Sequence, residues 1–193
     1  HGMYRAKVVD LCAGSGAIGL AFATEVPGSE VWAVEKSERT AQWTRRNLDE
    51  TTKRYPAIAG NYHLEIADAT QMPTLNQLDG TVDIVLTNPP YVPLASIPQQ
   101  PEVRDYDPDL ALYGGSADGT LIPERIISRA SKLLKPGAHG NGTRCHAGGA
   151  ACRFCTYLRF RRCRCAQRLH RSSALSDGRK ARNRIIQDVH ACR

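Results

Sequence analysis

The sequence predicts an α/β domain built on an open, mostly parallel sheet. A short apolar run near the start leads into a glycine-rich turn, a second apolar run ends in a carboxylate, and a later one ends in a proline turn. Such runs alternating with helical patterns are typical of βαβ units, whose parallel strands present their carboxyl ends on one edge of the sheet. Strands are expected near residues 7–11, 31–35, 62–67 and 82–87.

The stretch from Val8 to Gly19 predicts a buried strand, a tight turn and the start of an apolar helix. Glycines in such a turn let the backbone approach a ligand closely, and the turn directs helix N–H groups at it. The spacing of Gly14, Gly16 and Gly19 also fits a dinucleotide fingerprint, so a nicotinamide-dependent dehydrogenase is an alternative on this motif alone. Cys12 in the turn is interpreted as a small packed residue rather than a nucleophile.

Two carboxylates follow the next two predicted strands. Glu35 ends the run from Val31 and is placed to accept hydrogen bonds from ribose hydroxyls. Asp68 follows the run 64–67, where an adenine ring could meet an acidic side chain at the edge of the sheet. We therefore expect a nucleoside-containing ligand at this edge.

Two helices are predicted from their patterns. The segment after Glu35 places charged residues at 38–39 and 45–46 toward solvent, with Ala41 and Leu48 inside. The segment from Ile122 to Leu134 is amphipathic and ends before Lys135-Pro136-Gly137.

The segment Asn88-Pro89-Pro90-Tyr91 follows the last predicted strand of this series. Two prolines fix two φ angles, remove two donors and push the preceding residues out of the α region, so the segment presents carbonyl oxygens. The Asn88 oxygen with a proline carbonyl can accept both hydrogens of an NH2 group, and Tyr91 supplies a flat face. This favours methyl transfer onto nitrogen over hydride transfer, because a dehydrogenase has no evident need for a pair of acceptors that hold both hydrogens of an NH2 group.

With these motifs in order, residues 7–137 resemble the catalytic domain of the glutamine N5-methyltransferases that modify peptide chain release factors, the HemK or PrmC family. The resemblance also rests on a less general stretch after the proline turn. That stretch comprises Asp105-Tyr106-Asp107-Pro108, Ala111-Leu112-Tyr113-Gly114-Gly115 and Asp118-Gly119.

The resemblance implies a Rossmann-like class I S-adenosylmethionine-dependent methyltransferase domain that acts in the cytoplasm, with release factors as substrates and no membrane partner. It implies catalytic roles for Asn88, Pro89, Pro90 and Tyr91. It implies cofactor contacts from Asp10, Gly14, Gly16, Glu35, Asp68 and Asn88, and no metal. Catalysis would depend on positioning, because an amide nitrogen is a poor nucleophile whereas the sulfonium is a strong methyl donor.

Two alternatives stay open. The same grip would hold the amino group of adenine in DNA or RNA, although 13 Lys and Arg against 17 Asp and Glu before residue 141 do not favour a phosphate backbone. The chain could also be an inactive fragment that only binds cofactor or partners.

The composition changes near residue 138, so we predict a partial catalytic core over 1–137 and an irregular tail over 138–193, disordered or out of frame. From Asn141 onward there are 13 Lys and Arg against 2 Asp and Glu, and six of the seven cysteines lie there. The family continues after its Pro-Gly turn with a buried strand, whereas Ala138 to His146 has no residues expected to fill a sheet. A chain incomplete at these strands should be marginally stable and weakly active or inactive. The start at His1 also predicts that a preceding substrate-recognition domain is missing.

A shifted reading frame is our leading hypothesis for the tail. Degenerate codons for Ala138 to Gly149, read one base later, permit leucine, methionine, valine, methionine, glutamate, histidine, aspartate, alanine, threonine, glutamine and glycine, which resembles the family's next strand and loop.

Two functional interpretations of the tail compete with a shifted frame. Cys152, Cys155, Cys163 and Cys165 with His146 and His170 could bind zinc, but their spacing is irregular. The arginines at 159, 161, 162, 164, 168 and 171 with Tyr157 and Phe160 could bind RNA. A disulfide framework is disfavoured because no signal peptide accompanies the cysteines.

Overall fold

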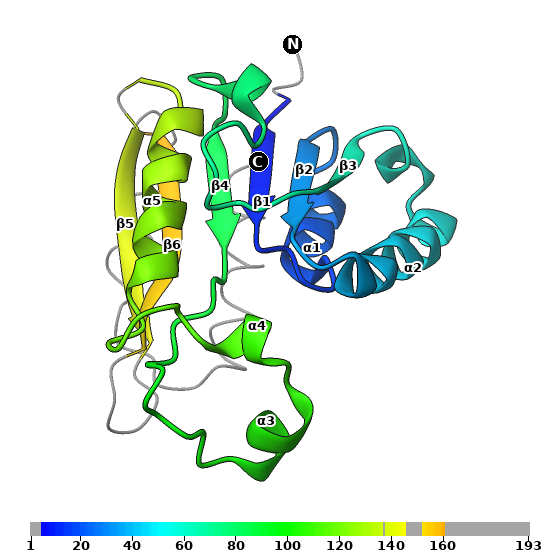
Figure 1. Cartoon of the computed structure of the whole chain (residues 1–193). Helices are drawn as coiled ribbons and strands as arrows, with labels where there is room; N and C mark the ends of the chain where they lie inside the picture. The colour runs from blue at the N-terminus through cyan, green and yellow to red at the C-terminus, as the bar shows by residue number, and fades with distance from the viewer. Residues whose placement is uncertain (1–4, 137, 146–151, 161–193) are drawn as a thin grey trace.

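The computed structural model describes residues 5–136, 138–145 and 152–160. Its sheet has the strand order β3-β2-β1-β4-β6-β5, with helices on both faces (Figure 1). The four predicted strands are present as β1 (Lys7–Leu11), β2 (Glu30–Glu35), β3 (Tyr62–Ile66) and β4 (Ile84–Thr87). All pairings among them are parallel. The order 3-2-1-4 is that of a Rossmann-like half, so the predicted fold class is confirmed.

Strand β1 lies at the centre of the parallel part of the sheet. Leu11 at its end is in register with Val34 of β2 on one side and Thr87 of β4 on the other. Because the strands are parallel, the turns that follow all three strands meet at one edge.

The two faces of the sheet have separate apolar cores, as the alternation of side chains along a strand requires. Val9 packs in a cluster with Ile126 and Leu133 of α5 (Leu121–Leu133). Val8 packs in the other cluster with Leu20 and Ala23 of α1 (Ala17–Glu25). Both faces are thus covered, which explains why the consecutive residues Val8 and Val9, on opposite faces of β1, are both apolar.

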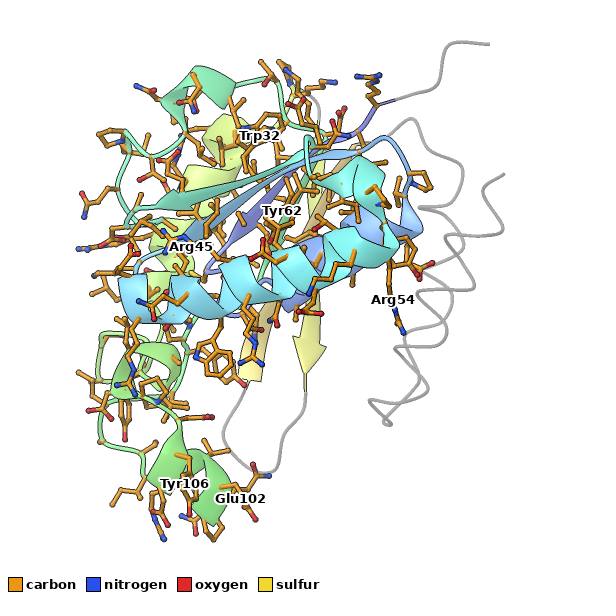
Figure 2. All side chains as sticks on the ribbon, turned by 90° about the vertical axis from the view of Figure 1, so that its right-hand side faces the viewer. Trp32, Arg45, Arg54, Tyr62, Glu102 and Tyr106 are labelled. Atoms are coloured by element: carbon orange, nitrogen blue, oxygen red, sulfur yellow. The ribbon has the colours of Figure 1, made fainter. Side chains whose placement is uncertain are left out.

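Helix α2 (Glu38–Arg54) confirms the helix predicted after Glu35. The Ser37 hydroxyl caps it by accepting the Thr40 N–H at 3.2 Å, and Lys53 and Arg54 in the last turn complement the helix dipole. Ala41 is fully buried. Figure 2 shows α2 lying along the face of the sheet that is turned toward the viewer, with Tyr62 of β3 beside it. The remaining described helices are short: Pro56–Ile58, Asn76–Leu78, α3 (Pro101–Tyr106) and α4 (Asp109–Leu112).

Arg129 is a fully buried cation on the inner side of α5. Its Nε donates to the Thr74 carbonyl oxygen at 2.8 Å, and its guanidinium pairs with Asp79. This side chain therefore ties α5 to the long connection between β3 and β4.

The segment after Pro136 contributes two strands to the sheet, contrary to the prediction that no residues there could fill one. Strands β5 (Ala138–Cys145) and β6 (Cys152–Phe160) form an antiparallel hairpin, and β6 pairs with β4 at Ile84↔Arg159 and Val85↔Leu158. The edge of β4 is therefore paired over two residues rather than open. Backbone pairing needs no apolar periodicity, and an edge strand offers unpaired N–H and C=O groups to any segment within reach, which accounts for the wrong prediction.

The boundary at 137 and the shifted frame stay hypotheses, which sequencing the coding DNA across Lys135 to Gly149 would test. The proposed zinc, RNA and disulfide sites involve side chains outside those that the structure describes. Within the described ranges, no helix is long and apolar enough to cross a membrane.

Replacing Arg129 with methionine should lower the free energy of unfolding by about 1–3 kcal/mol, because the buried Thr74 carbonyl would lose its donor. Urea unfolding of Arg129→Met measures the loss. Lys132→Met, exposed on the same helix, serves as the control and should change stability by less than about 0.5 kcal/mol. Equal stability of Arg129→Met and the parent chain would contradict this role for Arg129.

Candidate functional site

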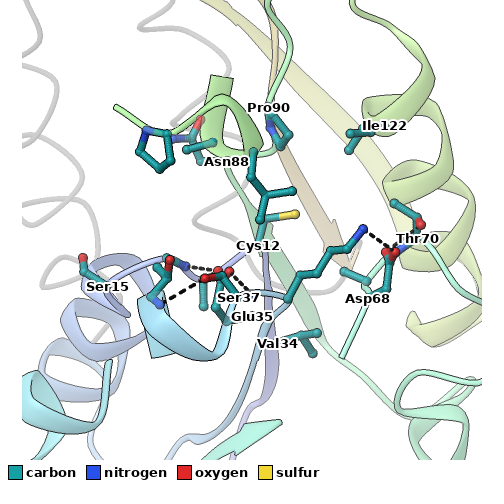
Figure 3. Close-up of a pocket in the computed structure, with 18 of the residues that line it drawn as sticks. Cys12, Ser15, Val34, Glu35, Ser37, Asp68, Thr70, Asn88, Pro90 and Ile122 are labelled. Carbon is teal, nitrogen blue, oxygen red and sulfur yellow. Dashed lines mark hydrogen bonds and ion pairs between the residues drawn. The ribbon is translucent and has the colours of Figure 1, made fainter. Parts of the chain in front are cut away.

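A cavity of about 880 Å³ lies at the carboxyl edge of the parallel strands. Figure 3 shows Glu35 and Asp68 on one side of it and Asn88 with Pro90 on the other, with Cys12 between them. The turns after β1, β2, β3 and β4 all contribute to its wall, as the sequence predicted. The lining residues from these turns include Cys12, Gly14, Ser15, Glu35, Asp68, Thr70, Asn88 and Pro90.

The glycine turn is fixed by side chains from α2 and β2. Thr44 donates its hydroxyl hydrogen to the Gly14 carbonyl at 2.7 Å, and the Asn47 amide donates to the Ser15 carbonyl at 2.9 Å. Gly14 has φ +60°, and a Cβ built there would meet no atom within 4 Å. The backbone of this turn is therefore held in place while its cavity side is left open for a ligand.

Glu35 joins the end of β2 to the glycine turn. One carboxylate oxygen accepts the Gly14 N–H and the other accepts the Ser37 N–H, each at 2.8 Å. A carboxylate oxygen has a second lone pair, so both oxygens can accept a further hydrogen bond. Glu35 is 8% exposed and lines the cavity, which suits a contact with vicinal hydroxyls.

Asp68 is oriented by two neighbours. Its Oδ1 accepts from the Thr70 N–H at 2.9 Å and from the Thr70 hydroxyl, and its Oδ2 lies 3.0 Å from Lys36 Nζ. Partial burial opposes ionisation, but these contacts outweigh it and lower the pKa of Asp68. The carboxylate is thus charged and fixed at the cavity wall.

Asp10 does not line the cavity, in contrast to the predicted contact with a ligand. It is fully buried beneath the turn, and its Oδ2 accepts the Gly19 N–H at 2.8 Å. Its Oδ1 has no hydrogen-bond partner among the described residues. Burial raises the pKa of Asp10 to about 7, the Gly19 N–H opposes this rise and the nearby Glu35 charge adds to it. Asp10 is therefore placed to position the turn rather than to touch a ligand. Gly16, at the start of α1, is also absent from the lining.

Cys12 lies in the turn with φ 63°. Burial, with smaller contributions from Glu35 and Asp10, raises the pKa of its thiol to about 12. The thiol is thus neutral at physiological pH, which supports its interpretation as a packed residue rather than a nucleophile.

The Asn-Pro-Pro-Tyr segment is tied to the glycine turn through Thr87. The Thr87 hydroxyl donates to the Leu11 carbonyl at 2.7 Å, joining the ends of β4 and β1. Asn88 is exposed to the cavity, and its side chain forms no hydrogen bond with the described residues. Pro90 lines the cavity, whereas Pro89 and Tyr91 do not. The amide of Asn88 is therefore available to a ligand.

Tyr91 and Val92 are fixed by the chain that returns toward α5. Both of their N–H groups donate to the Leu112 carbonyl, and Gly114 N–H donates to the Val92 carbonyl at 3.0 Å. Gly119 has φ +77°, and a Cβ there would lie 2.2 Å from the Tyr91 carbonyl oxygen. This close approach explains why glycine occupies position 119, in the stretch that resembles the family.

The sequence motifs did not identify several residues of the site. Lys36 follows Glu35 directly, and Thr44 and Asn47 are three positions apart on α2, so a helical projection aimed at the glycine turn could have found the latter two. Trp43 and Tyr106 line the cavity from segments far apart in the chain, and no local pattern indicates that.

A family model covers the part of the chain that supplies the strand-end turns of this site. The family model described as conserved hypothetical protein 95 matches residues 1–101, just over half of the chain, including the glycine turn, Glu35, Asp68 and the proline turn. The chain belongs to this family.

Similar curated proteins extend the match beyond residue 101. The release factor glutamine methyltransferase of Bifidobacterium longum is 75% identical over 137 residues, which are 71% of this chain and 47% of that protein. A 4-amino-L-phenylalanine/4-methylamino-L-phenylalanine methyltransferase of Streptomyces pristinaespiralis is 37% identical over 130 residues, 67% of this chain and 40% of that protein. The resemblance inferred from the motifs is confirmed, and the chain spans less than half the length of these relatives.

A solved structure from Agrobacterium tumefaciens, described as a predicted O-methyltransferase, aligns with a TM-score of 0.49 at 20% identity. The alignment covers 81% of this chain and 73% of that one.

Replacing Asp10 with asparagine should remove a pH-dependent loss of stability. The pKa of Asp10 is raised on folding, so its stabilising contribution is complete below the unfolded pKa of about 3.9 and is lost as pH rises through 7. The stability of Asp10→Asn relative to the parent should therefore increase by roughly 2–4 kcal/mol between pH 4 and pH 8. Urea unfolding at both pH values measures this, with Asp49→Asn as the exposed control. A difference that is the same at both pH values would contradict it.

Gly119→Ala should destabilise the fold by about 2–4 kcal/mol, because a methyl group there overlaps the Tyr91 carbonyl and alanine disfavours the positive φ. Thermal unfolding measures the loss. Gly60→Ala is the matched control, since a Cβ at Gly60 meets nothing within 4 Å and its φ is not positive. An unchanged melting temperature for Gly119→Ala would show that the close approach is not a constraint.

Proposed function

We propose that this chain transfers a methyl group from S-adenosylmethionine to the side-chain amide nitrogen of a glutamine in peptide chain release factors. The observation that carries the proposal is the cavity, where Glu35 and Asp68 lie across from the free amide of Asn88 and Gly14 also belongs to the lining. Support comes from the 75% identity to a release factor glutamine methyltransferase over 137 residues.

The residues of the wall fit S-adenosylmethionine. The open space at Gly14 admits the cofactor beside the backbone, the unused lone pairs of Glu35 suit the ribose hydroxyls, and the charged Asp68 suits the exocyclic amino group of adenine. Because Lys36 already pairs with Asp68, the lysine and the adenine amino group would both bind to the same carboxylate. When bound, the cofactor supplies an electrophilic sulfonium methyl group.

The chain's own residues would orient the acceptor. The Asn88 side-chain oxygen and a proline carbonyl accept the two hydrogens of the glutamine NH2, which turns its nitrogen lone pair out of the hydrogen-bonding plane and toward the methyl group. The hydrogen bond from the Thr87 hydroxyl to the Leu11 carbonyl fixes the Asn-Pro-Pro-Tyr segment relative to the glycine turn. Alignment of this kind can supply on the order of 7–11 kcal/mol of a barrier reduction.

An adenine amino group in DNA or RNA is the alternative acceptor. Residues 91–120, which form one wall of the cavity, carry five carboxylates and one arginine, and this charge opposes a phosphate backbone. The charge supports a protein substrate, and a release factor would place the reaction in the cytoplasm.

Asn88→Ala should abolish methyl transfer to a release factor while leaving the affinity for S-adenosylmethionine within about threefold, because Asn88 is assigned mainly to the acceptor. Glu35→Ala should instead weaken cofactor affinity by about tenfold or more, because the variant lacks the carboxylate that would accept hydrogen bonds from the ribose hydroxyls. Transfer of labelled methyl groups and isothermal titration calorimetry measure the two effects.

Asn76→Ala changes an exposed asparagine in the connection between β3 and β4 that does not line the cavity, so this variant is the matched control and should behave as the parent. Equal loss of transfer and cofactor affinity in Asn88→Ala would refute its assignment. Cofactor binding without transfer in the parent chain would favour the inactive-fragment alternative.

A further inference from the structure

The mouth of the cavity is surrounded by exposed apolar side chains. Among the described residues, ten large apolar side chains are at least 36% exposed, and five of these line the cavity. We name these five the apolar rim: Ile18, Trp43, Tyr106, Leu110 and Leu121. Half of the exposed large apolar side chains thus gather at one opening, a concentration that marks interaction surfaces rather than ordinary protein surface.

The two sides of the rim come from different parts of the chain. Ile18 and Trp43 lie on α1 and α2, beside the cofactor wall. Tyr106 and Leu110 lie on the insertion, which we define as residues 91–120 between β4 and α5. Figure 2 shows Tyr106 and Glu102 together on α3 of the insertion, beyond the carboxyl end of the sheet. A segment that crosses the mouth would therefore contact both sides.

The insertion is acidic where it is most exposed. Glu102, Asp107 and Asp109 have exposed side chains and no ion pair or side-chain hydrogen bond with the described residues, whereas Asp105 is paired with Arg104. The side of the rim on α2 is basic instead, with Arg39 lining the cavity and Arg46 lying 5.6 Å from the centre of the Trp43 ring. The charge therefore changes sign across the mouth.

We propose that the insertion docks a basic polypeptide segment flanking the acceptor glutamine, with the apolar rim covering the residues next to it. Apolar and aromatic contacts around the opening suit a polypeptide, and the unpaired carboxylates suit lysine or arginine on one flank only. This inference rests on the proposed function for the identity of the acceptor. It adds the location of the docking surface and the charge that the flanking segment must carry.

The test uses the 193-residue chain with synthetic peptides that hold one central glutamine. One pair of peptides carries three lysines on the N-terminal or the C-terminal flank, and a matched pair carries three glutamates. Methyl transfer gives KM and kcat, and fluorescence anisotropy of the same labelled peptides gives affinity without any need for transfer.

One lysine-flanked peptide should have a KM about five- to tenfold lower than its glutamate counterpart at low salt, and the difference should shrink as salt is added. The double variant Glu102→Lys with Asp109→Lys should remove or reverse this preference with kcat within about twofold. The control, Asp49→Lys with Glu50→Lys on α2, makes the same change in net charge away from the rim and should keep the preference. Tyr106→Ser should raise KM for both charge types alike.

Equal affinity for lysine- and glutamate-flanked peptides, or equal responses of the two double variants, would overturn the proposal. Tighter binding of a single-stranded RNA probe than of any peptide would overturn it as well. Charge-dependent binding of peptides without methyl transfer would support the docking surface and count against the proposed reaction. Methyl transfer without charge dependence would support the proposed reaction and count against the docking surface.

Discussion

The parallel pairing of β1 with β2 and β4 is the constraint on which the site depends. It brings the glycine turn, Glu35 and the Asn-Pro-Pro-Tyr segment to one edge, although the first and the last of these are separated by more than seventy residues in the chain. Two hydrogen bonds then fix the ends of neighbouring strands relative to one another more closely than strand pairing alone does. One runs from Gly14 to Glu35 and the other from Thr87 to Leu11. The apolar cores on both faces of β1 hold this arrangement in place, so the geometry of the site depends on the packing of the core.

The site separates groups that line the cavity from groups that hold them in place. Glu35 and Asn88 face the cavity, whereas Asp10, Thr44 and Gly119 act behind it on the backbone. Preorganisation of this kind matters for the proposed reaction, because an amide nitrogen is a poor nucleophile whose alignment with the methyl group must carry the catalysis. The neutral thiol of Cys12 agrees with a site that works by placement.

The strands, the two long helices and the cavity edge could be predicted because apolar runs, glycine spacing and helical periodicity are local signals. The buried position of Asp10 beneath the glycine turn could not, since a strand-end carboxylate looks the same in sequence whether it points into a cavity or beneath the turn. The hairpin of β5 and β6 was missed because its pairing uses backbone groups that every residue carries. Tyr106 and Trp43 reach one opening only through the tertiary fold.

The closed base of the insertion has a consequence for how substrate choice could diversify. Val92 and Tyr113 bridge at its base, and Gly114 and Gly119 pack against the neighbouring backbone, so residues 93–111 leave and return at nearly the same place. A loop anchored in this way can vary in length or composition while its attachment points stay still. The insertion can thus change without disturbing the cavity, so related chains that share the proposed methyl transfer could differ in the substrates that they accept.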